Sequence, residues 1–163
     1  MAKLLPQIPR FVIALLLVVA IVNLLIGVFL RYVMVDITDW LDIDPIRFTW
    51  VEEVGEFTLA WLTLLGAAVG VRERMHFTLH VLSLTPAVRR WIDRLNHVLI
   101  AAFGLVTAWY GVGLCAINTS VKSAGLEISL AILYGSSVAG GVLIAIYAIS
   151  MIIAPPKAVQ SDH

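Results

Sequence analysis

Charged side chains are scarce in this sequence. They make up 13% of its 163 residues, whereas 61% of the residues are hydrophobic. A water-soluble domain carries about 25% charged residues, because its surface has to be polar. The surplus of apolar side chains therefore has to face lipid, and the composition predicts an integral membrane protein.

Cysteine is almost absent, and neither sign of charge is in excess. Cys115 is the single cysteine and lies in an apolar stretch, so the chain can form neither an internal disulfide nor a thiolate metal cluster. Eleven basic residues balance eleven acidic ones, so no overall positive field is available to attract nucleic acid. These features disfavour nucleic-acid binding and predict neither a metal site nor a cofactor.

Catalytic signatures are missing as well. The sequence contains no glycine-rich nucleotide-binding loop, no nucleophile elbow and no metalloprotease pattern. An enzyme would have no recognisable set of reacting residues here. We therefore predict that the chain is not an enzyme.

Long apolar stretches are what the sequence does have. Residues 11–30, 95–121 and 128–154 contain no Asp, Glu, Lys or Arg. Twenty helical residues, at about 1.5 Å each, cover the ~30 Å of hydrocarbon in a bilayer. A fourth stretch, residues 57–71, is too short to cross unless it borrows the preceding turns back to Trp50.

The sequence thus predicts an all-α integral membrane protein with four transmembrane helices in a single membrane domain, residues 1–163. The predicted crossings are approximately 11–34, 48–71, 93–118 and 128–153. Lys3 and Arg10 before the first crossing imitate a secretory signal. Its 20-residue apolar run is longer than a usual signal core, however, and no A-x-A-like cleavage site follows, so we expect a retained helix.

Two connecting segments are expected to be short amphipathic helices at the lipid surface. Residues 36–46 interleave four aspartates with apolar side chains, and residues 76–92 lie within the stretch 72–96, which carries five arginines. Within the second segment, Thr85 and Pro86 predict a helix start, with the threonine hydroxyl as cap and proline at the first helical position.

The distribution of basic residues predicts the orientation. If both termini and the central loop are cytoplasmic, eight basic residues lie on that side and three, Arg31, Arg47 and Lys122, lie on the other. Loops rich in Lys and Arg remain cytoplasmic. We therefore expect the N- and C-termini in the cytoplasm.

Acidic residues open the second predicted helix, at Glu52, Glu53 and Glu56. An acidic side chain costs roughly 2.5 to 3.5 kcal/mol at mid-membrane and less toward the interface, so these charges require partners or headgroups. Their spacing of three and four residues places them on overlapping faces of the helix. Two interpretations stay open: interfacial carboxylates that are solvated or meet a partner's cations, and an ion or proton pathway through Glu56.

Small residues close the same helix. The stripe 66–71 allows close packing against another helix, and Asn23 and Gly27 in the first helix are likewise expected to face a neighbour. Arg72 and His76 follow the stripe.

Histidines lie near the predicted cytoplasmic surface. His76, His80 and His97 are imaginable metal or haem ligands, but no Cys, Asp or Glu is placed to complete a zinc set. Solvated or hydrogen-bonded histidines are the simpler interpretation.

The tryptophans fit a membrane protein without a cofactor. Trp40 and Trp50 mark one membrane surface and Trp91 the other, as interfacial anchors do. Trp61 and Trp109 lie deeper, where they either pack between helices or contact another subunit.

This order of features resembles the small membrane subunit of tripartite ATP-independent periplasmic (TRAP) transporters, the DctQ family. The resemblance is carried by Trp50, Glu52, Glu53, Trp61, residues 66–68, Arg72 and His76. The length of the chain, four crossings and cytoplasmic termini agree with it. One departure is the segment 134–137, Tyr-Gly-Ser-Ser, where members of the family often carry a proline; it bears on the subfamily.

The resemblance implies a division of labour in a bacterial inner membrane. A periplasmic substrate-binding protein (DctP type) captures an organic acid, such as a C4-dicarboxylate, a keto acid or a sialic acid, and a large membrane subunit (DctM type) moves it with a sodium gradient. The small subunit binds no substrate and supports the large one as a rigid bundle surrounded by membrane lipids. The implied interface or orientation residues are Trp50, Glu52, Glu53, Glu56, Trp61, Arg72 and His76.

Two other functions stay open from the sequence. The first is an autonomous four-helix transporter driven by protons, although such exporters place an essential acid deep in the first helix and this first helix has none. The second is a haem-bearing or anchoring membrane subunit of a redox complex, which an absorption spectrum of the purified protein would reveal.

Overall fold

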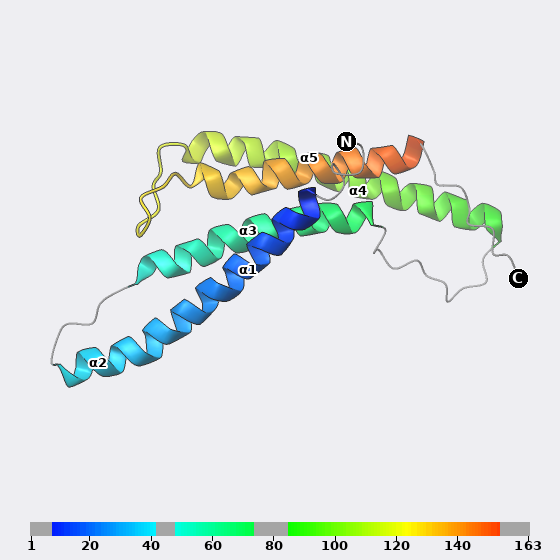
Figure 1. Ribbon diagram of the computed structural model, residues 1–163. Coiled ribbons are helices and arrows are strands. Elements are labelled where there is room, and N and C mark those ends of the chain that lie inside the picture. The colour runs from blue at the N-terminus through cyan, green and yellow to red at the C-terminus, as the bar shows by residue number, and fades with distance from the viewer. Residues whose placement is uncertain (1–7, 42–47, 74–84, 154–163) are drawn as a thin grey trace, which may run out of the picture.

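Helices make up nearly all of the structure. The computed structural model describes residues 8–41, 48–73 and 85–153. They form α1 (Ile8–Phe29), the π-helical turn η1 (Leu30–Met34), α2 (Val35–Trp40), α3 (Thr49–Arg72), α4 (Pro86–Asn118) and α5 (Ala131–Ile153) (Figure 1). Four helices are long and apolar enough to cross a membrane. The prediction of an all-α membrane protein with four transmembrane helices is confirmed.

The four long helices lie in an open row. Within the described residues, close backbone contacts join α1 to α3, α3 to α5, and α5 to α4. Figure 1 shows α3 and α5 running in one direction and α1 and α4 in the other. The expectation of a bundle is wrong in this respect, because α1 and α4 do not meet. A row leaves more of each helix exposed to lipid or to another protein than a closed bundle does.

The first crossing is longer than a bilayer requires. α1, η1 and α2 follow one another without a break from Ile8 to Trp40, which corresponds to about 50 Å of helix. Only its α1 part makes close backbone contacts with α3, and α2 diverges from α3 at the far end (Figure 1). Trp40, at the tip of α2, is 85% exposed.

The predicted start of α4 is confirmed, but its predicted cap is not. α4 begins at Pro86, and Thr85 occupies the N-cap position in an extended conformation. The threonine hydroxyl makes no capping hydrogen bond, so the proline and the backbone define this helix start.

The predicted interfacial segments lie partly outside the described residues, which omit 42–47 and 74–84. Of residues 36–46, the part up to Trp40 continues the first long helix as α2. Of residues 76–92, the part from Pro86 forms the first turns of α4. Their position at the lipid surface stays a prediction.

A close helix contact joins α4 to α5 through two matching Gly-x-x-x-Ala pairs. A Cβ atom on Gly104 would lie 2.7 Å from the backbone nitrogen of Ala145, and one on Gly141 would lie 2.7 Å from that of Ala108. The absence of side chains at both glycines therefore lets the two backbones touch, which is how helices associate in lipid.

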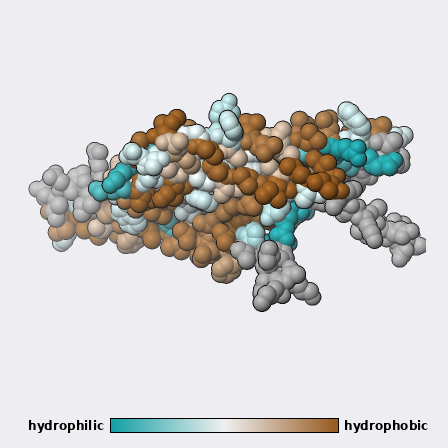
Figure 2. All heavy atoms as spheres, turned by 90° about the horizontal axis from the view of Figure 1, so that it is seen from above, coloured by the Kyte–Doolittle hydropathy of each residue, from teal (hydrophilic) through white to brown (hydrophobic). Residues whose placement is uncertain are grey.

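Buried apolar residues are few and follow the row. Ala68 and Val71 of α3, Ala101 of α4, and Ile144 and Ala148 of α5 form one cluster. Most large apolar side chains point outward instead. Figure 2 shows the result: hydrophobic residues cover most of the face seen from above, and hydrophilic residues gather mainly toward its ends.

Candidate functional site

Glu53, near the start of α3, binds the loop that joins α4 to α5. The backbone N–H groups of Gly125 and Leu126 donate to its two carboxylate oxygens, Oε1 and Oε2, at 2.7 Å each. Both bonds are charge-assisted, the stronger class of protein hydrogen bond. The carboxylate thereby holds together two segments that lie 72 and 73 residues apart in the sequence.

The loop itself is a tight reversal of the chain. Lys122 and Ser129 form an isolated antiparallel bridge, and the N–H of Ser123 donates to the carbonyl of Ile128 at 2.9 Å. Glu127 adopts a left-handed conformation, with φ of 54°, which lets the chain turn back. The reversal directs the amides of Gly125 and Leu126 toward α3.

Gly125 is required by the close approach of the loop to α3. A Cβ atom at this position would lie 2.6 Å from the backbone nitrogen of Trp50 and 2.9 Å from its Cα. No side-chain rotation relieves a contact with backbone atoms. Trp50 therefore supports the loop with its main chain.

Glu52 and Glu56 point away from this loop. Glu52 accepts from Nη2 of Arg31 in η1 at 3.5 Å, and both side chains are largely exposed, which makes the ion pair weak. Glu56 is exposed and forms neither a hydrogen bond nor an ion pair within the described part of the chain.

These two carboxylates belong to a continuous exposed face of α3. Its exposed residues, from Glu52 to Ala67, are spaced by four, three, four and four residues, which is the spacing of one helix face. A methyl group added to the two glycines on this side, Gly66 and Gly70, would meet nothing within 4 Å. We call this side the open face of α3; its exposed members are Glu52, Glu56, Leu59, Thr63 and Ala67, and the half-buried Gly66 and Gly70 lie on the same side.

The small-residue stripe is thus divided between two sides of α3. Ala68 is fully buried in the core cluster, so the prediction of close packing holds at this position. Gly66 and Gly70 have no such neighbour among the described residues. Among the described residues, glycines allow close packing between α4 and α5 and, at Gly140, between α5 and α3.

α1 packs against α3 on a different side from the open face, as we predicted from Asn23 and Gly27. The side-chain amide of Asn23 donates to the carbonyl of Val51 at 2.9 Å and is 9% exposed. A Cβ atom on Gly27 would lie 3.2 Å from the side chain of Val51, and one on Gly55 would lie 3.2 Å from Asn23. The expectation that both residues face a neighbouring helix is confirmed.

The two deep tryptophans have different surroundings. Trp61 of α3 donates its Nε1–H to the carbonyl of Ile132 in α5 at 3.1 Å, so it packs between helices of this chain. Trp109 of α4 is 79% exposed, so its ring faces lipid or another subunit.

The other end of α3 carries a second group of charges. Nε of Arg10 in α1 lies 2.5 Å from Oε1 of Glu73. The guanidinium of Arg72 lies over the ring of Tyr147 in α5, 5.8 Å from its centroid, within the range of a cation–π interaction. His76 and His80 lie outside the described residues.

The predicted site residues therefore do not form one site. Trp50, Glu52, Glu53 and Glu56 lie at one end of α3, and Arg72 lies at the other, a full membrane crossing away. The described residues contain no group of three or more His, Cys, Asp and Glu side chains that could hold a metal ion.

The partner of Glu53 was missed at the level of sequence. Neither interpretation of the acids considered a partner within the chain, because backbone amides have no signature in side-chain patterns. The available signal was a turn in the polar gap between two apolar runs, at Gly125, Leu126 and Glu127. Such a turn presents backbone N–H groups that a carboxylate can bind.

Comparison with known families gives one match. A family model described as "Tripartite ATP-independent periplasmic transporters, DctQ component" matches residues 20–155, which is most of the chain. No curated protein shows a significant match.

Proposed function

Because the chain belongs to the DctQ family, and so is the small subunit of a tripartite ATP-independent periplasmic transporter, we propose that it is the scaffold that holds the large membrane subunit (DctM type) in the bilayer. The large subunit would carry out sodium-coupled uptake of an organic acid, such as a C4-dicarboxylate, a keto acid or a sialic acid. A periplasmic substrate-binding protein (DctP type) would deliver that acid.

The proposed location is the bacterial inner membrane, with both termini in the cytoplasm. The eight-to-three distribution of basic residues supports this orientation. It places the α4–α5 loop and Glu53 on the periplasmic side, and Arg10, Arg72 and Glu73 near the cytoplasmic surface.

The open face of α3 is the observation that carries the proposal. Lipid tails are as apolar as leucine, so transmembrane helices associate through small residues and polar groups. The exposed sides of α1 and α4 carry large apolar residues such as Leu25 and Phe103, which suit lipid. The open face of α3 combines two carboxylates with open glycines, which suit another helix.

The chemistry of this face defines its partner. Glu52 and Glu56 require hydrogen-bond donors or cations, because a carboxylate within a membrane helix is costly without them. Gly66 and Gly70 allow a helix backbone to approach closely at the other end of the face. We therefore propose that a helix of the large subunit lies along α3, with basic or donor side chains opposite Glu52 and Glu56.

Trp50, Glu53 and Trp61 would serve this interface indirectly. Glu53 and the backbone of Trp50 hold the α4–α5 loop, and Trp61 joins α3 to α5. Arg72 orients the opposite end of α3 against Tyr147, and His76 is proposed to lie at the same cytoplasmic surface.

The first test omits the small subunit. Vesicles containing the large subunit alone, with binding protein and substrate outside, are expected to show uptake at background level, because the moving parts lack a fixed frame. Vesicles containing both membrane subunits are the control. Uptake at the normal rate without this chain would contradict the scaffold proposal.

A second test addresses the open face of α3. The double substitution Glu52→Gln and Glu56→Gln is expected to lower the co-purified large subunit about tenfold, since interhelical hydrogen bonds in membranes contribute about 0.6–2 kcal/mol each. Gly66→Leu is expected to do the same sterically without destabilising the isolated chain, because the position is open.

The matched control for the charge change is Glu127→Gln, an exposed carboxylate at the same end of the molecule but outside the open face. Co-purification is expected to be unchanged in this variant. If both the Glu52→Gln, Glu56→Gln double variant and Gly66→Leu assembled normally, the large subunit would have to bind a surface other than the open face of α3.

The pathway interpretation of Glu56 has a separate readout. If a proton or ion passes by way of Glu56, the single substitution Glu56→Gln should abolish the normal dependence of uptake on sodium and pH. We expect both dependences to be unchanged, because Glu56 is exposed and lies one helical turn from Glu52 on the open face of α3, and not in an enclosed passage.

A further inference from the structure

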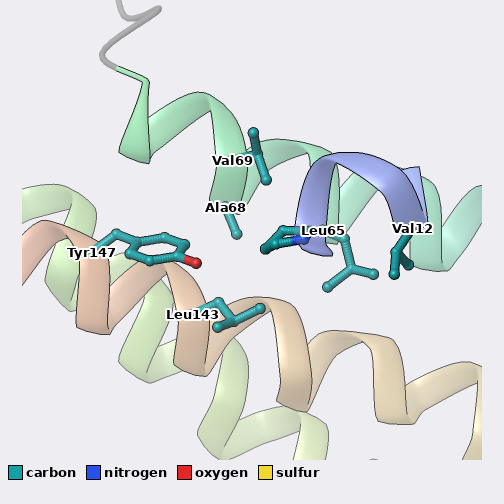
Figure 3. A pocket seen from close by; sticks show the side chains of 7 residues that line it. Val12, Leu65, Ala68, Val69, Leu143 and Tyr147 are labelled. Atoms are coloured by element: carbon teal, nitrogen blue, oxygen red, sulfur yellow. The ribbon is translucent and has the colours of Figure 1, made fainter. Parts of the chain in front are cut away.

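An apolar pocket lies between three helices near the end of the row that holds the first turn of α1. Its volume is about 130 Å³, and residues of α1, α3 and α5 line it (Figure 3). Figure 3 shows Leu143 and Tyr147 of α5 facing Ala68 of α3 across it. The lining residues are Pro9, Val12, Leu65, Ala68, Val69, Leu143 and Tyr147.

The character of the lining decides what the pocket can hold. An apolar cavity of about 150 Å³ stays dry and takes up a molecule the size of benzene. This pocket has a similar size and an apolar lining, so its natural contents are several hydrocarbon carbons and not water. It lies in the membrane-spanning part of the chain, where lipid tails supply such carbons.

A charged rim lies beside the pocket, at the end of the row. Arg10 comes two residues before Val12 in α1, and Arg72 and Glu73 follow Val69 in α3. Nε of Arg10 contacts Oε1 of Glu73. Arg10 and Arg72 thus bring two guanidinium groups to this rim, and Glu73 brings one carboxylate.

Tyr147 connects the pocket to the rim. Its ring lines the pocket, and the guanidinium of Arg72 lies 5.8 Å from the centre of the same ring. A cation therefore lies directly above a hydrocarbon-lined space. Basic sites between transmembrane helices at the cytoplasmic side are the kind that bind anionic lipid headgroups.

We propose that the pocket and the rim form a binding site for one anionic phospholipid. A segment of its acyl chain fills the pocket, and its phosphate lies beside Arg10 and Arg72. The lipid would fill the space between α1 and α5, which make no close backbone contact with each other. This inference goes beyond the scaffold function and does not depend on it.

The pocket is tested with a phosphatidylglycerol probe that carries a photoreactive diazirine in its acyl chain. The probe is added in trace amount to phosphatidylcholine vesicles containing the assembled transporter. After irradiation, mass spectrometry is expected to find adducts on the peptides that contain Val12, Leu65 and Tyr147. Val12→Trp, which fills the pocket, is expected to lower this labelling at least about fivefold.

The matched control is Val18→Trp, which adds the same bulk to α1 at a position that is 56% exposed to the surroundings. Labelling of the pocket peptides is expected to be unchanged there. Equal labelling in Val12→Trp and the unmodified chain would overturn the proposal. Loss of the large subunit from Val12→Trp with unchanged lipid labelling would overturn it too, because it would assign the pocket to a protein side chain.

The rim is tested by two substitutions with opposite expected effects. Each basic residue near a membrane surface favours anionic over neutral lipid by about fivefold. Arg10→Gln is therefore expected to lower the preference for phosphatidylglycerol over phosphatidylcholine about fivefold, and Glu73→Gln is expected to raise it by a similar factor. Competition between the two unlabelled lipids for the probe measures the preference, and two unchanged values would contradict the assignment of the headgroup.

Discussion

Alanine at Gly104 or Gly141 is expected to destabilise the protein by about 2–3 kcal/mol, the upper part of the usual range for overpacking. The reason is that the added Cβ meets backbone on the facing helix. At Gly104 it would lie 2.7 Å from the nitrogen of Ala145 and 2.8 Å from the carbonyl oxygen of Gly141. Because a backbone cannot rotate away as a side chain does, α4 and α5 have to move apart. Thermal unfolding in detergent measures the change.

Gly113→Ala is the matched control for this prediction. Gly113 lies on the same helix, but an added Cβ would meet nothing within 4 Å. Alanine favours helix over glycine by about 0.8–1.0 kcal/mol, so the control is expected to be neutral or stabilising. Equal destabilisation by all three substitutions would show that glycine itself, and not the contact between α4 and α5, is the cause.

Glu53→Ala is expected to release the α4–α5 loop from α3. The carboxylate accepts from the amides of Gly125 and Leu126 at 2.7 Å each, so its removal leaves both donors without their acceptor. We expect hydrogen exchange at these two amides to rise about tenfold or more, because exchange reports local opening. Mass spectrometry of the peptide that contains the loop measures it.

Two substitutions separate this effect from a general loss of charge. Glu53→Gln keeps one carbonyl acceptor, so the increase in exchange is expected to be smaller than in Glu53→Ala. Glu56→Gln removes a carboxylate that lies one turn away and has no contact with the loop, so exchange there is expected to be unchanged. A loop that stays protected in Glu53→Ala would show that its own bridge, Lys122 to Ser129, suffices.

Both predictions concern the rigidity that a scaffold requires. The Gly104 and Gly141 contact joins α4 to α5, Trp61 joins α5 to α3, and Asn23 joins α3 to α1. Each neighbouring pair in the row thus has a specific connection besides apolar packing. A row connected in this way would keep its shape while the proposed partner moves along one face.

The crossings were predictable because the bilayer imposes them. A membrane helix has to satisfy its own backbone and has to be about 20 apolar residues long, so uncharged runs show the helices directly. The residues from Trp50 to Glu56 were recognised as the start of the second long helix for the same reason. Asn23 was also predicted to face another helix, because a polar side chain within an apolar run requires a partner.

The arrangement of the helices was not predictable from these runs. When a helix is apolar all around, the periodicity of its sequence hardly indicates which side faces lipid and which side faces another helix. Gly66 and Gly70 were expected to mark close packing, yet a Cβ atom added there would meet nothing within 4 Å, whereas one on Gly104 or Gly141 would meet the backbone of the facing helix. Both pairs are glycines in membrane helices, and only the positions of neighbouring helices distinguish them.

The sequence alone determined that this chain crosses the membrane four times, which family it resembles, and that carboxylates open α3. Those properties follow from composition and spacing along one dimension. Only the tertiary structure decided that Glu53 is bound by amides from a distant loop while Glu52 and Glu56 stay on an open face, and that the helices form a row. The physical reason is that almost every residue has a backbone amide, so the sequence does not mark the amides that bind Glu53. Distances between helices are defined only once the chain has folded.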